Sequence, residues 1–154
     1  MKIVTSATND TTKTIDDAKV LKEGEGLLPK DDLVKSLNIY KLNYYISHEN
    51  YTAYEKTALE YYKNPNEFNG SELLVAASVF VENVKNPTSL QTAARWAEKV
   101  VMSQESYDST SILAQLYDKL GKRDEAKMFA GMAANFANEE NKDATEMNEI
   151  LNKK

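Results

Sequence analysis

The feature that most constrains the fold is a pair of amphipathic helices joined by a turn at Gly121. Apolar residues of the first helix recur with the spacing of one helical face: Leu113, Leu116, Tyr117 and Leu120. Glycine then ends that helix, because it enters the left-handed region at little steric cost. The contact face of the second helix is almost all alanine, which lets the helices lie close: Ala126, Phe129, Ala130, Ala133 and Ala137. So short a turn requires antiparallel packing, and we predict a helical hairpin over residues 110–138.

Helical spacing also recurs before this hairpin. A helix is predicted to begin near Asp31 or Asp32, either of which can cap the free N–H groups. Asn50 is predicted to cap the next helix, which runs from Tyr51 to about Tyr62. No alternating apolar and polar run is long enough to predict a strand.

Two pairs of residues have the spacing of a capping box, Asn69 with Glu72 and Thr88 with Gln91. Each pair precedes an apolar periodic run and therefore predicts the start of a helix. Pro87 separates the two helices, because the residue before a proline avoids helical angles.

A last helix is predicted to open at Asp143 and Glu146. Its apolar residues Met147, Ile150 and Leu151 lie on one face. We expect them to cover apolar surface that a further hairpin would otherwise bury, so this helix is predicted to act as a terminal cap.

Composition excludes several classes of protein. The chain has 154 residues and a formal net charge of −5, whereas nucleic-acid binding requires a basic stripe. It has no cysteine, and therefore no disulfide, thiolate metal site or cysteine nucleophile. No run approaches the roughly 18 apolar residues of a membrane helix. The first residues lack the apolar stretch of a secretory signal.

The helical pairs repeat along the chain. The interval from Ala93 to Ala126 is the same as the interval from Val100 to Ala133. Both are close to the period of about 34 residues that is typical of the helix–turn–helix units in tetratricopeptide solenoids. The segment from Gln115 to Ala126 resembles the centre of such a repeat, with small, aromatic and turn-glycine positions matched by Ala114, Tyr117, Gly121, Ala126 and Ala133. The proline that often closes the repeat is absent, so a longer second helix is expected.

The helical spacing of every periodic run predicts an all-α fold. Together with the resemblance, it implies a short right-handed solenoid of about three tetratricopeptide-like helical hairpins with a C-terminal capping helix. Residues 30–154 form the predicted repeat domain. Residues 1–29 are predicted to be a flexible segment, within which the spacing of Ile15, Ala18 and Leu21 suits a short helix stopped by glycine.

A wider resemblance covers residues 69–154. The strings 81–87 and 94–101, followed by the repeat around Tyr117, are similar to the helical segment that follows the thioredoxin-like domain in some bacterial exported proteins. This resemblance implies a periplasmic or exported location if the chain is part of such a protein, and a cytoplasmic one otherwise. The redox domain itself is not in these residues.

The conspicuous side chains have structural explanations. His48, the only histidine, lies at the end of a predicted helix, where a cation favours the helix dipole. Trp96 is expected to pack between adjacent hairpins. Most of a dense tyrosine set is expected to fill the core of the first hairpin, although tyrosine is also common at interfaces; the set is Tyr40, Tyr44, Tyr45, Tyr51, Tyr54, Tyr61 and Tyr62.

These patterns predict no catalytic, cofactor-binding or metal-ligating residue, and no cofactor. Two functions stay open: a non-catalytic protein–protein interaction or scaffold module, and an accessory C-terminal module of a thioredoxin-like oxidoreductase. The expected partner is another protein, a peptide or a domain of the same polypeptide, with no nucleic acid and no membrane span. By the resemblance, the partner groove is lined by Ser36, Asn43 and Ser47 in the first hairpin and by Ser111, Gln115 and Asp118 in the last.

Overall fold

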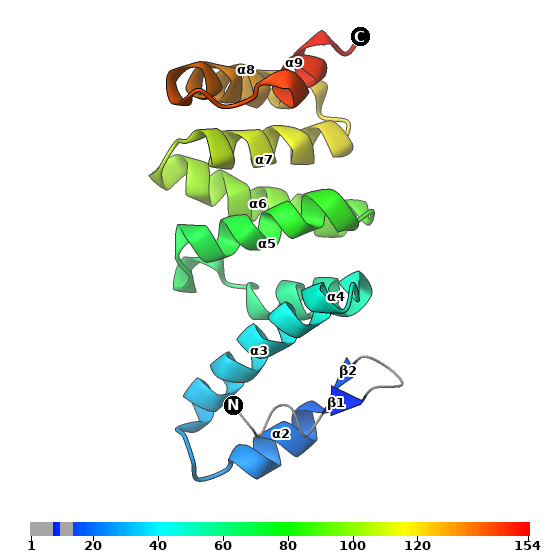
Figure 1. Cartoon of the computed structure of the whole chain (residues 1–154), viewed down its shortest axis with the longest axis vertical. Coiled ribbons are helices and arrows are strands. Elements are labelled where there is room, and N and C mark those ends of the chain that lie inside the picture. Colours follow the sequence, from blue (N-terminus) through cyan, green and yellow to red (C-terminus); the bar gives the residue numbers. More distant parts are fainter. Residues whose placement is uncertain (1–7, 10–13) are drawn as a thin grey trace. The chain divides into compact units, whose positions relative to one another are not determined.

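The computed structural model describes residues 8–9 and 14–154, and the chain divides into two compact units, Met1–Tyr61 and Tyr62–Lys154. Eight α-helices, one 3₁₀ helix and two strands of two residues each make up the regular structure of the described residues. The all-α prediction is therefore confirmed (Figure 1). The division falls between Tyr61 and Tyr62, whereas the sequence suggested one boundary, after Pro29.

The first unit holds a short hairpin and three helices. β1 (Thr8–Asn9) pairs with β2 (Thr14–Ile15) in antiparallel register, a pairing too short for the sequence pattern to predict. α2 (Asp17–Gly24) follows, and α3 (Lys30–Ser47) packs against it. Ile15, Val20 and Leu37 form the small core between them. The predicted flexibility of the N-terminal segment rests largely on residues 1–7 and 10–13, which lie outside the described residues.

α3 (Lys30–Ser47) begins earlier than predicted. Neither Asp31 nor Asp32 caps it, because both lie inside its first turn, and Pro29 stands at the N-cap without a side-chain hydrogen bond. Two carboxylates in the first turn still suit the positive end of the helix dipole. α4 (Tyr51–Tyr61) packs against α3. The cap of α4 is confirmed, since Asn50 Oδ1 accepts the Ala53 N–H at 3.1 Å.

The second unit begins with a 3₁₀ turn, η1 (Pro65–Glu67), followed by α5 (Gly70–Asn83). The predicted capping box of α5 is confirmed: Asn69 Oδ1 accepts the Glu72 N–H at 2.9 Å, and the Glu72 carboxylate accepts the Asn69 N–H at 3.4 Å. This reciprocal pair satisfies two N–H groups that the first turn leaves free.

The second predicted capping box, at the start of α6 (Pro87–Ser103), is wrong. Thr88 and Gln91 lie inside the helix, and Asn86 is the N-cap, with Oδ1 accepting the N–H groups of Thr88 and Ser89. Pro87 stands at the first helical position, where its fixed φ suits the helix and its missing N–H costs nothing. The proline thus begins α6 as well as separating it from α5.

The central hairpin comprises α7 (Tyr107–Lys119) and α8 (Arg123–Glu140). Gly121 has a φ of +71°, as the turn prediction requires. α7 begins before Thr110 because Ser106 and Ser109 form a capping box there. The alanine face of α8 is buried, with Ala126, Ala130 and Ala133 all 0% exposed. α8 also runs past Asn138, as expected from the missing proline, and ends where Asn141 takes the left-handed conformation.

α9 (Thr145–Asn152) closes the chain and packs against both α7 and α8. Ala144 is its N-cap without a side-chain hydrogen bond, while Asp143 Oδ1 accepts the Thr145 N–H at 2.9 Å. Asp143 was predicted to open this helix and does bond its first residue. Within the second unit, α5 contacts α6 and α7, α6 contacts α7, and α7 contacts α8 (Figure 1, green to red).

Candidate interaction surface

The residues predicted to line a groove fall in both units. Ser36, Asn43 and Ser47 lie on α3 of the first unit, and all three are exposed. The Ser47 hydroxyl donates to the Tyr44 carbonyl at 2.8 Å, so it already satisfies its own helix. The other three predicted residues belong to α7 of the second unit.

Ser111 differs from its two predicted companions on α7. Its side chain is buried, and its hydroxyl donates to the Asp108 carbonyl one turn earlier at 3.2 Å. A hydroxyl that bonds the preceding turn needs no further partner. Ser111 therefore offers little surface to a ligand.

Gln115 and Asp118 lie together on one pocket. Its volume is about 110 Å³, and α5, α7 and α9 all contribute to its wall. The lining residues are Val81, Gln115, Asp118, Lys119, Glu146, Glu149, Ile150 and Lys153. Six of these eight residues are polar or charged, and both signs of charge are present. Such a pocket is large enough for one side chain of a partner and too small for a typical cofactor.

Both predicted α7 side chains are engaged by α9 or the residue that follows it. The Gln115 amide nitrogen donates to Glu146 Oε2 at 2.8 Å. The Asp118 carboxylate pairs with the ammonium group of Lys153 and, at 3.7 Å, with the guanidinium group of Arg123. The turn that follows α8 has thus brought a short helical segment onto the surface that the sequence assigned to a partner.

Sequence reasoning did not include Glu146 and Lys153 in the site. A signal for Glu146 was present, because residues four apart in a helix share a face and Ile150 follows it by four positions. Ile150 is 3% exposed, so Glu146 lies beside the buried face of α9. Lys153 follows the helix and carried no such signal.

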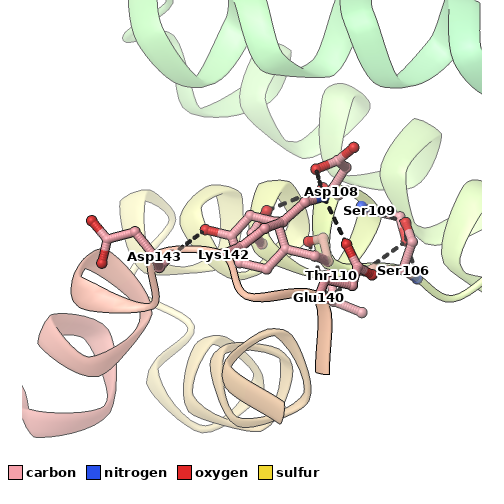
Figure 2. A network of polar contacts seen from close by, with 9 residues as sticks. Ser106, Asp108, Ser109, Thr110, Glu140, Lys142 and Asp143 are labelled. Atoms are coloured by element: carbon pink, nitrogen blue, oxygen red, sulfur yellow. Dashed lines mark hydrogen bonds and ion pairs between the residues drawn. The ribbon is translucent and has the colours of Figure 1, made fainter. Parts of the chain in front are cut away.

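A second group of polar contacts holds the loop between α8 and α9 (Figure 2). Lys142 Nζ lies 3.1 Å from Asp108 Oδ1 and 2.8 Å from Glu140 Oε2, and 4.9 Å from the centre of the Tyr107 ring. The Tyr107 hydroxyl donates to the Asp143 carbonyl at 2.9 Å. The start of α9 is therefore tied to the first turn of α7.

Neighbouring groups shift the pKa values of three residues in and beside this loop. Hydrogen bonds to Glu140 and Asp108 raise the pKa of Lys142 above its ordinary value. Hydrogen bonds from the Thr145 hydroxyl and N–H lower the pKa of Asp143. Burial raises the pKa of Tyr107, and the carboxylates of Glu146 and Asp143 add to the effect. All three groups keep their ordinary charge state near neutral pH, so the contacts are present there.

The hydroxyl groups at the start of α7 have a structural role (Figure 2). Ser109 N–H donates to Ser106 Oγ at 3.2 Å, and Ser106 N–H donates to Ser109 Oγ at 3.1 Å. The Thr110 hydroxyl donates to the Ser106 carbonyl at 2.6 Å. These bonds satisfy the first turn of α7 and fix the point to which the loop is tied.

The conspicuous aromatic side chains are accounted for by packing. Trp96 is 1% exposed and meets Phe80 of α5 edge-to-face at 5.2 Å between ring centres, and Tyr62 at 5.6 Å. It therefore packs against α5 of its own helix pair and against the segment that precedes η1. The expectation that it packs between hairpins stays a prediction. His48 stacks on Tyr44, with Nδ1 2.8 Å from the Tyr44 carbonyl.

The predicted tyrosine core of the first hairpin holds in part. Tyr45 and Tyr54 are buried in the first unit, whereas Tyr62 is buried in the second unit. The remaining four are partly exposed, namely Tyr40, Tyr44, Tyr51 and Tyr61.

Over residues 8–9 and 14–154, no group of three or more His, Cys, Asp or Glu side chains could hold a metal ion. In the same part of the chain, no helix has the length and apolar character needed to span a membrane.

Comparison of the chain with protein-family models, curated proteins and solved structures gave no match. The resemblances to tetratricopeptide repeats and to thioredoxin-associated segments therefore stay predictions. The surface of α7 has to be interpreted from its own contacts.

Proposed function

We propose that the chain is a non-catalytic protein–protein interaction module, built as a short solenoid of tetratricopeptide-like hairpins with α9 as its cap. The paired helices in this scheme are α3 with α4, α5 with α6, and α7 with α8. The contacts of α5 with both α6 and α7 support stacking of successive pairs. The outer side of α9 is polar, with Asn148 and Asn152 exposed, which suits the end of a stack.

The spacing of the helices agrees with a repeat. Gly70 and Tyr107 begin α5 and α7, Pro87 and Arg123 begin α6 and α8, and the two intervals are nearly equal. Both are longer than the alanine interval counted from the sequence, by about one helical turn. A difference of one turn leaves residues on the same helical face, so the two kinds of interval are compatible with one repeat.

The observation that carries the proposal is the engagement of Gln115 and Asp118 by a short helical segment. Side chains from α9 and Lys153 contact both residues, and α9 buries Met147 and Ile150 in the same unit. Ile150 of α9 lines the same pocket as Gln115 and Asp118, so this surface combines an apolar contact with polar groups. This is the composition of a typical protein-binding surface.

Lys119 offers a test that leaves the internal contacts in place. It is exposed, lines the pocket and lies outside the Gln115 and Asp118 contacts. A charge reversal there, Lys119→Glu, should weaken capture of a partner at least tenfold. Lys85→Glu makes the same change of charge at an exposed position after α5 and serves as the control.

The measurement is capture from cells that produce the chain, with the bound proteins quantified by mass spectrometry. We expect a protein that the parent and Lys85→Glu capture equally and that Lys119→Glu loses. Equal capture by all three chains would contradict a role for the α7 surface and favour a module that only spaces a neighbouring domain. Catalytic turnover by the purified chain would contradict the non-catalytic part of the proposal.

A further inference from the structure

α9 is attached to the second unit by a limited set of contacts. It has eight residues, and only Met147 and Ile150 are buried along it. The loop from Asn141 to Asp143 that precedes it is exposed. Isolated helices of this length are unstable in water, so α9 is a helix only while it is docked.

The polar contacts of α9 follow the length of α7. The first links Asp143 to Tyr107, the second links Glu146 to Gln115, and the third links Lys153 to Asp118. Positions increase together on the two segments, so α9 runs in the same direction as α7. A first helix of a further hairpin would also run in this direction beyond α8.

We propose that α9 is a helical ligand held in cis, and that the partner of this surface is an amphipathic helix that takes its place. This inference rests on the proposed interaction function and specifies its ligand. The docked sequence defines the partner: a glutamate followed at once by an apolar residue, a second apolar residue three positions on, and a lysine three positions further. Glu146, Met147, Ile150 and Lys153 are that set.

Competition follows from this arrangement. A partner helix and α9 use the same side chains of α7, so the partner binds only the fraction of molecules in which α9 is undocked. The apparent affinity is then the intrinsic affinity reduced by that fraction. Weakening α9 must therefore increase partner affinity, provided that the surface of α7 is unchanged.

The experiment uses the full chain and a synthetic peptide of residues 142–154 with fluorescein at its C-terminus. The weakened chain carries Met147→Ala and Lys153→Gln, which alter α9 and the residue after it and leave α7 and α8 intact. The control chain carries Asn148→Ala and Lys154→Gln, exposed positions with the same change of charge. Hydrogen exchange of residues 145–152 and fluorescence anisotropy of the peptide are measured for each chain.

We expect at least tenfold faster exchange of α9 in the weakened chain and an equal fold decrease in the apparent Kd for the peptide. Both quantities report the undocked fraction, so the two factors must agree while that fraction is small. The control chain should match the parent in both measurements. A peptide with Met147→Asp and Ile150→Asp should not bind.

Three results would overturn the inference. One is exchange of α9 no faster than that of α7 and α8 in the parent chain. Another is faster exchange without tighter peptide binding, and the third is no peptide binding to the weakened chain. No cellular partner is needed here, so failure of this experiment is distinct from failure of the Lys119→Glu capture.

Discussion

The α7–α8 hairpin and α9 contact each other and yet are held in place in different ways. In the hairpin, four alanines of α8 are at most 1% exposed, which brings the helix backbones close over the whole length of α8. α9 buries two large side chains and depends on polar contacts at its two ends. The buried alanines give α8 a continuous contact along its length. The two large side chains of α9 give a contact that can open while the hairpin stays folded.

Magnitudes support this contrast. Burial of Met147 and Ile150 contributes about 1.5–3 kcal/mol each. Exposed ion pairs such as that of Lys153 add only about 0–1 kcal/mol each. The docking of α9 is therefore marginal, and its opening free energy should lie well below that of global unfolding.

The largest expected effect is a difference in the free energy of unfolding lost when a core residue of the hairpin, or one of α9, is truncated. Leu116 and Met147 are both 0% exposed. Leu116→Ala should lower the free energy of unfolding by about 2–5 kcal/mol, because it leaves a cavity in the hairpin. Met147→Ala should cost clearly less, since α9 can undock and thereby limit the loss. Urea unfolding followed by circular dichroism measures both, and equal losses would contradict the contrast.

An overpacking pair tests the alanine face next. Ala133 is fully buried and Ala134, its neighbour, is partly exposed. Ala133→Leu should cost about 1–3 kcal/mol, because the helices cannot move apart without loss of contact elsewhere. Ala134→Leu should be close to neutral. If both variants melt like the parent, the hairpin register described here is wrong.

Two glycines should respond to alanine with opposite signs. Gly121 has positive φ, so Gly121→Ala should destabilise the chain by about 1 kcal/mol through backbone strain alone, since no atom lies within 4 Å of the added carbon. Gly131 lies inside α8 with equally open space. Gly131→Ala should stabilise by about 0.5–1 kcal/mol. Thermal unfolding gives both signs, and two changes in the same direction would refute the assignment.

An effect of similar size is expected at alkaline pH. Burial, followed by the hydrogen bond to the Glu98 carboxylate, raises the pKa of Tyr117 well above its ordinary value. The unfolded chain loses this proton near pH 10 and the folded chain keeps it, so stability present below pH 10 is lost as the pH rises further. The loss from this group should be about 1 kcal/mol at pH 10.5.

Tyr117→Phe should remove that part of the alkaline loss. The measurement is the difference in unfolding free energy between pH 8 and pH 10.5, for the parent and for the variant. A variant that loses as much as the parent between these pH values would show that Tyr117 ionises normally in the folded chain.

Local signals in the sequence predicted much of the fold. Gly121, the Asn69–Glu72 capping box and the Asn50 cap were identified correctly because each depends on residues within one turn. Thr88 with Gln91 has the same spacing as a capping box and failed. Asn86 was the better cap, since Pro87 after it suits the first helical position.

The candidate surface was less accessible to sequence reasoning. Gln115 and Asp118 were predicted from the resemblance to the repeat and line one pocket, whereas Ser111, predicted with them, is buried. Glu146 and Lys153 also contact this surface, but they belong to a segment far from α7 in the sequence. Their place in the surface depends on where that segment docks. Periodicity predicts which face of a helix is buried, and it does not specify the element that covers it.

Native-state hydrogen exchange of the unmodified chain at increasing urea tests the contrast between hairpin and α9 most directly. We predict that amides of residues 148–152 exchange through an opening with low free energy and little dependence on urea. Buried amides of α7 and α8 should exchange only through global unfolding, with strong dependence on urea. If the amides of α9 and of the hairpin share one opening free energy and one urea dependence, α9 is an inseparable part of the core and the account is contradicted.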